Sequence, residues 1–81
     1  MAKTERQTEI TERHRIAAPD GQLGVVEART TFMRIQYLDL SWSEWQVEVT
    51  RFFWGRTQVN LREDGNWETP EISPRLLTRQ A

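Results

Sequence analysis

The sequence predicts a single small, mainly β domain, built as a bent antiparallel β-sheet or a small barrel of five to six strands. Three observations predict this class. Short segments alternate apolar and polar residues, turn-forming glycines and prolines separate these segments, and β-branched or aromatic residues fill the apolar positions. The 81 residues leave room for one domain, and a chain of this size buries only about 60% of the surface that it exposes when unfolded.

The N-terminal segment 1–9 is polar, carries charges of both signs and lacks an apolar period, so we predict that it is flexible. An exposed helix over 3–15 is the alternative, although Ile10 alone would then face a core. The segment contains no hydrophobic stretch of the kind that secretory signals carry. The β domain is therefore expected to span 10–70.

The turn sequence APDG at 18–21 predicts a first hairpin, because proline and glycine suit the second and fourth turn positions. A two-residue loop sets Ile16 opposite Val25. A three-residue loop with Gly21 as the bulge glycine sets Arg15 opposite Val25 instead. We favour the two-residue loop, because it pairs apolar with apolar residues and opposite charges with each other.

A second hairpin is predicted from two alternating segments, 33–37 and 45–50. The first strand continues to Leu40, and a four-residue loop at 41–44 sets Leu40 opposite Trp45. This register sets Met33 opposite Phe52. A helix that opens with the capping box at 41–44 is the alternative, but the β-branched residues of the second segment favour a strand.

In the first strand of this hairpin the apolar residues move from odd positions, 33–37, to even positions, 38–42. In the second strand they move from odd positions, 45–49, to even positions, 52–54, and in the predicted register the two changes lie side by side. Phe52 and Trp54 then share a face with Met33, opposite the face of Trp45 and Val47. A hairpin of this kind suits a bent sheet, or a sheet whose far end is covered by a second subunit.

A short strand is predicted at 58–62, followed by a three-residue turn in which Gly65 is the bulge glycine. This turn sets Leu61 opposite Trp67. The chain then leaves the sheet, and 71–81 is expected to be a tail or a short helix, since Ser-Pro is typical of a helix start.

The charges nearly balance, with 11 Lys and Arg against 12 Asp and Glu. A protein that binds nucleic acid through phosphates needs a positive face, which here only folding could gather. Almost all the basic residues are arginine, which favours planar or stacked contacts. The absence of cysteine fits a cytoplasmic protein, and apolar runs of three residues or fewer argue against a transmembrane helix.

Enzyme chemistry has little support in the sequence. His14 is the sole histidine, its neighbours Arg13 and Arg15 offer no carboxylate to orient it, and Glu27 is its hypothetical cross-strand partner. We expect a surface or structural histidine. No zinc-type ligand set, glycine-rich phosphate loop or serine triad is recognisable, so we expect no enzyme, no cofactor and no small-molecule substrate.

The aromatic residues are concentrated between positions 32 and 54, where they predict a core, an interface or both. The main hypothesis is a non-enzymatic interaction or structural module that binds another protein or itself, as a homodimer or small oligomer. The alternative is a protein that binds single-stranded nucleic acid through the strand RFFWGR, since bases stack on sheet aromatics flanked by arginine. The predicted partner-binding residues are Met33, Arg51, Phe52, Trp54 and Arg56.

Overall fold

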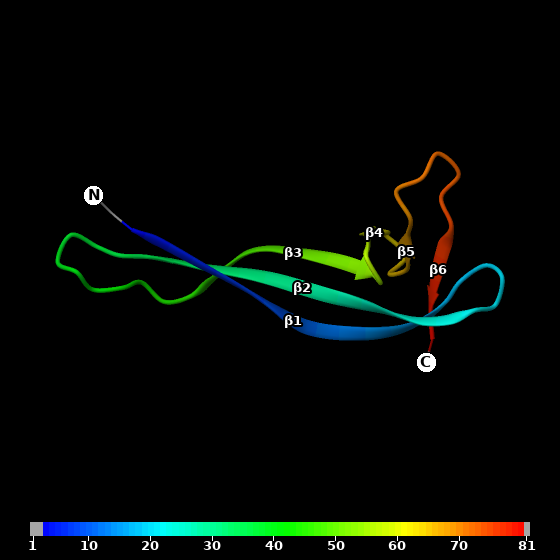
Figure 1. Cartoon of the computed structure of the whole chain (residues 1–81), viewed down its shortest axis with the longest axis horizontal. Helices are drawn as coiled ribbons and strands as arrows, with labels where there is room; N and C mark the ends of the chain where they lie inside the picture. Colours follow the sequence, from blue (N-terminus) through cyan, green and yellow to red (C-terminus); the bar gives the residue numbers. More distant parts are fainter. Residues whose placement is uncertain (1–2, 81) are drawn as a thin grey trace.

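Six antiparallel strands form one sheet that closes into a ring at one end of an elongated molecule (Figure 1). The computed structural model describes residues 3–80 and measures 56 × 27 × 22 Å. The strands neighbour one another in chain order, and the last returns to the first; they are β1 (Thr4–Ala17), β2 (Leu23–Ile35), β3 (Gln46–Trp54), β4 (Thr57–Leu61), β5 (Trp67–Glu68) and β6 (Leu76–Arg79). The predicted all-β single domain is confirmed. The ring is not a regular barrel, because β6 pairs with β1 through only two residue pairs.

The first three strands are much longer than the ring needs. Strands β1, β2 and β3 continue away from the ring as a three-stranded ribbon, which ends in the loop 36–45 (Figure 1). We call residues 4–11, 29–35 and 46–51 the ribbon and residues 36–45 the tip. The strand pairing shifts by one residue in both β1 and β3 along the ribbon, which marks a β-bulge in each edge strand.

The first hairpin has the three-residue loop, and the favoured two-residue loop is wrong. Arg15 lies opposite Val25, and Ala18 bonds Gln22 across the loop. Gly21 has a φ of +85° and donates its N–H to the carbonyl of Ala18. A turn followed by a glycine in the left-handed region matches the twist of the two strands, which explains why this loop prevails over better side-chain pairing.

The second hairpin differs from the prediction in register and in loop length. Met33 lies opposite Gln46, whereas Phe52 lies opposite Ala28. The physical reason is in the ring: this register sets bulky Phe52 and Trp54 beside small or β-branched residues of β2 on the inner face. The segment 46–54 is a strand, as predicted, and the capping-box helix does not form.

The turns on either side of β4 are short. A two-residue turn at Gly55, whose φ is +61°, joins Trp54 to Thr57. Gly65 then adopts a φ of +86°, and Leu61 lies opposite Trp67. The second of these turns and its register are confirmed.

The two ends of the chain lie in the sheet. Residues 4–9, predicted to be flexible, form the first part of β1 and pair with β2; residues 1–2 lie outside the described residues. No helix is present in residues 3–80, so the short C-terminal helix suggested for 71–81 is not formed. Instead β6 completes the ring, and Thr69 closes the preceding loop by accepting the N–H of Arg75 at 2.9 Å.

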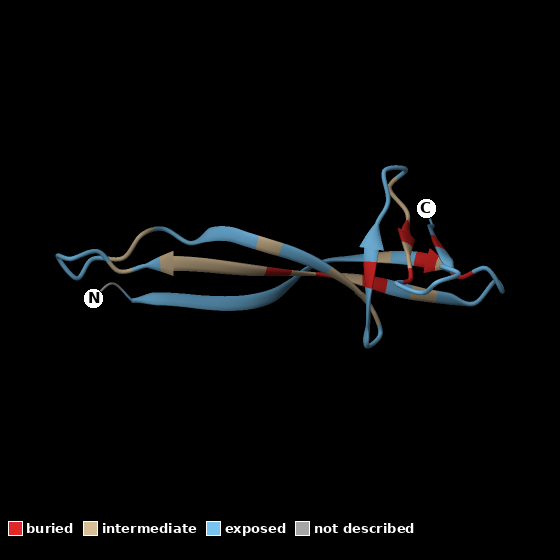
Figure 2. Ribbon diagram, turned by 90° about the horizontal axis from the view of Figure 1, so that it is seen from above, coloured by how far each residue is buried: buried red, intermediate tan, exposed pale blue. Residues whose placement is uncertain are grey.

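The hydrophobic core lies wholly within the ring (Figure 2). Its largest member is Trp67, whose side chain is fully buried. The rings of Phe52 and His14 lie 5.8 and 5.0 Å from it. Gly24 allows close packing here, because a Cβ at this position would lie 2.9 Å from the indole nitrogen of Trp54. The buried hydrophobic core residues are Ile16, Ala18, Val26, Val59, Trp67 and Leu77.

Replacing Trp67 by alanine should unfold most of the protein. Removing a fully buried indole costs about 3–5 kcal/mol of unfolding free energy, which approaches the whole stability of a small domain. The matched control is Trp45→Ala, because Trp45 lies exposed at the edge of the tip and its loss should cost about 1 kcal/mol or less. Urea unfolding followed by circular dichroism compares the two, and equal losses would contradict this description of the core.

Candidate functional site

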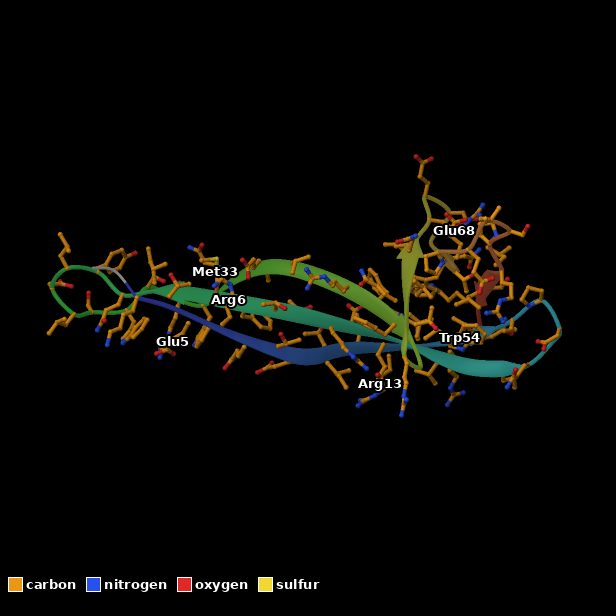
Figure 3. All side chains as sticks on the ribbon, turned by 45° about the horizontal axis from the view of Figure 1, so that its top comes forward. Glu5, Arg6, Arg13, Met33, Trp54 and Glu68 are labelled. Atoms are coloured by element: carbon orange, nitrogen blue, oxygen red, sulfur yellow. The ribbon has the colours of Figure 1, made fainter. Side chains whose placement is uncertain are left out.

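The structure does not bring the five predicted partner-binding residues together. Phe52 and Trp54 pack against the core of the ring, so this chain itself covers much of their surface. Arg51 and Arg56 are exposed, on β3 and in the turn after it. Met33 is partly buried on the ribbon beside Arg6, far along the molecule from Trp54 (Figure 3).

Exposed apolar side chains gather instead at the tip and the adjoining ends of β2 and β3. The sequence pattern suggested that several of these side chains face a core. The apolar and polar residues alternate up to residue 37, whereas β2 ends at Ile35. Leu38 is the extreme case, with 92% of its surface exposed. The exposed apolar residues of this region are Ile35, Tyr37, Leu38, Leu40, Trp45 and Val47.

Leu40 combines exposure with backbone strain. Its φ is +71°, which makes it the one non-glycine residue with a positive φ in residues 3–80, and its surface is 73% exposed. The left-handed conformation costs a leucine about 1–2 kcal/mol. Two bonds fix it, from the Leu40 N–H to the carbonyl of Tyr37 and from the Gln36 amide to the carbonyl of Leu40.

Asp39 organises the turn beside Leu40. Its carboxylate accepts hydrogen bonds from the hydroxyl and the backbone N–H of Ser41. The hydroxyl bond first, and the backbone bond second, hold the pKa of Asp39 below its ordinary value. The turn is therefore built around an ionised carboxylate at neutral pH.

The base of the tip is held by stacking on an arginine. The guanidinium of Arg34 lies 4.5 Å from the ring centre of Trp42 and 4.7 Å from that of Trp45. Glu5 of β1 accepts a bond from the same guanidinium at 2.9 Å. The arginine-rich composition is thus used for stacked contacts, as the sequence indicates.

A second concentration of side chains lies where the ribbon joins the ring, mostly on the outer face of the sheet. Arg13 and Arg15 alternate with inward-facing residues of β1, Arg29 lies between buried residues of β2, and Arg51 of β3 lies opposite Arg29. Arg13 points to the side of the sheet away from Glu68 (Figure 3). We call Arg13, Arg15, Arg29, Arg51 and Arg56 the arginine face.

His14 has a structural setting, and the hypothesis that Glu27 is its partner is wrong. Its Nε2 lies 2.8 Å from a carboxylate oxygen of Glu12 on the same strand, because the three-residue loop places His14 opposite Val26. The imidazole stacks beside Trp67 at the edge of the core. Its position therefore supports the packing of the ring.

A groove with a volume of about 480 Å³ lies beside the first hairpin, lined by Arg15, Ile16, Leu23, Gly24, Val25 and Gln80. Within residues 3–80, no group of three or more His, Cys, Asp or Glu side chains is placed to hold a metal ion. No helix in the described part of the chain has the length and apolar character needed to cross a bilayer.

No protein-family model, curated protein or solved structure matches this chain. A proposal for the function therefore rests on the two surfaces just described, the apolar tip and the arginine face.

The titration of Asp39 should report the integrity of the tip. Its carboxyl should titrate below the ordinary value of 3.8, so the stabilisation of the turn is present above that pH and is lost as the pH falls through the lower, folded-state pKa. In Ser41→Ala the largest cause is removed, and the midpoint should rise toward 3.8. Carboxyl carbon chemical shifts measured against pH give both midpoints. Identical midpoints in the two proteins would show that the turn is not organised in this way.

Proposed function

We propose that this chain is a non-enzymatic interaction module that associates with a second copy of itself through the tip and the adjoining end of the ribbon. The observation that carries the proposal is Leu40, a large apolar side chain held in a strained conformation and exposed to water. Strained residues of this kind cluster at sites that bind a partner, because a partner's contacts offset the cost.

The neighbours of Leu40 support the proposal. Leu38, Tyr37 and Val47 expose more than half of their surface, so an apolar patch continues from the tip onto β3. Contiguous exposed apolar surface of this kind marks interaction sites in soluble proteins. Burial of these side chains against a partner would supply the hydrophobic stabilisation that the ribbon lacks.

The charges beside the patch favour an uncharged partner surface. Arg6 pairs with Glu48 at 2.9 Å, and Arg34 pairs with Glu5 at the same distance. Since these charges already neutralise each other, the ribbon adds no net charge beside the exposed apolar side chains of the tip, whose own carboxylates are Asp39 and Glu44. A second copy of the tip offers the same surface, as a two-fold symmetric contact requires.

The open edges of the ribbon support contact through the tip rather than through strand addition. Bulges interrupt both edge strands, and charged side chains such as Glu9 and Glu48 stand along them. Bulges and charges on edge strands are devices that oppose pairing with another chain. The association is therefore expected to be closed and small.

Replacing Leu40 by asparagine should weaken self-association by at least about tenfold, because the variant removes a central apolar contact. Its thermal stability should stay equal or rise, since asparagine tolerates a positive φ far better than leucine. Light scattering after size-exclusion chromatography over a range of protein concentrations measures the association.

The matched control is Ile72→Asn, because Ile72 is fully exposed in the loop between β5 and β6, at the other end of the molecule. Its association should equal that of the wild type. A wild type that stays monomeric at every concentration, or a Leu40→Asn variant that associates as well as Ile72→Asn, would contradict the proposal.

A further inference from the structure

We infer that the arginine face is a second binding site, where the ribbon joins the ring, and that its ligand is single-stranded nucleic acid. This site is separate from the tip, and it extends beyond the strand 51–56 to residues of β1 and β2. The linear charge pattern shows no positive segment, and the strand pairing brings these arginines together.

The arginines without an ion pair are concentrated on the arginine face. Arg15, Arg51 and Arg56 make no ion pair and no side-chain hydrogen bond within residues 3–80, and all three belong to the arginine face. The arginines outside this face are engaged: Arg6, Arg34, Arg62 and Arg75 pair with carboxylates, and Arg79 stacks on Trp67.

Positive charge is in local excess on the arginine face. Arg29 lies directly opposite Arg51 on adjacent strands, a like-charge pairing that opposes folding. Glu27 is the one carboxylate that pairs with this face in the described chain, and Arg13 and Arg29 share it at 3.6 and 3.2 Å. The five guanidinium groups and Glu27 together carry a net charge of +4, in a protein whose total is −1.

The arginine face also carries an aromatic ring on which a base can stack. Phe53 lies opposite Glu27 and Gln58, so its ring stands on the outer face, unlike those of Phe52 and Trp54. The guanidinium of Arg29 lies 4.3 Å from the centre of the Phe53 ring. An unpaired base can extend this stack on the guanidinium plane, as bases do on the sheets of RNA-binding domains.

The size of the face favours a single strand over a duplex. Neighbouring strands are about 4.8 Å apart and alternate residues about 6.6 Å apart, so the arginine Cα atoms of β1, β2 and β3 lie within roughly 15 Å. A sheet face of this size offers no element that enters a groove, whereas it suits a short unstacked strand whose phosphates the arginines contact. An acidic peptide would match the charge but would leave the stack unused.

The test is fluorescence anisotropy of a labelled single-stranded oligonucleotide about ten nucleotides long, titrated with the full chain at low salt. Binding should weaken with salt, with a slope of log K against log salt of about −2 to −3.5 for three to five phosphate contacts. The double variant Arg51→Gln/Arg56→Gln should bind at least about tenfold more weakly and flatten the slope by about 1.4. Phe53→Leu should lose about fivefold or more, through the lost stacking.

The matched control is Arg62→Gln/Arg75→Gln, which removes the same charge from paired arginines outside the face and should bind like the wild type. Circular dichroism confirms that each variant is folded. The Leu40→Asn variant should also bind normally, which separates failure of this site from failure of the tip. Absence of binding, an equal loss in the control variant, or equal competition by double-stranded DNA or a poly-glutamate peptide would overturn the inference.

Discussion

The packing of Trp67 inside the ring is the interaction on which the rest of the structure depends. Strand β5, which carries it, is two residues long and contributes little backbone pairing of its own. The indole nevertheless contacts Phe52 of β3 and His14 of β1. It therefore links strands that have to come together for the ring to close. The chain is too small for a second core of this kind, so everything beyond the ring is built without one.

The ribbon is held by weaker contacts. Thr30 links Thr11 of β1 to Thr50 of β3 through hydroxyl bonds of 2.9 and 3.1 Å, and salt bridges join the strands farther out. Each such contact contributes on the order of 1 kcal/mol or less. A ring that holds the core and extends a weakly held ribbon is suited to presenting a tip at a distance from that core, and the proposed nucleic-acid site at the base of the ribbon is separate from the tip.

The sequence predicts local features of this fold better than distant ones. The turn before Trp67 was predictable because a bulge glycine and its flanking strands lie within a few residues of each other. The pairing of Met33 was not, because the register of β2 and β3 is set by Phe52 packing opposite Ala28, a contact that alternation alone does not reveal. For the same reason Phe52 and Trp54 resembled a partner-binding surface, although they pack against the core and Leu38 and Leu40 of the tip are the more exposed side chains.

The division between ring and ribbon can be measured directly by amide hydrogen exchange, followed by NMR at low and high protein concentration. Slow exchange is expected for the ring strands at both concentrations, because they enclose the core. Amides of 32–35, beyond the bulge, should exchange faster in dilute solution and become protected as the concentration rises. Uniform protection along β2 that does not change with concentration would contradict both the single core in the ring and the role of the tip.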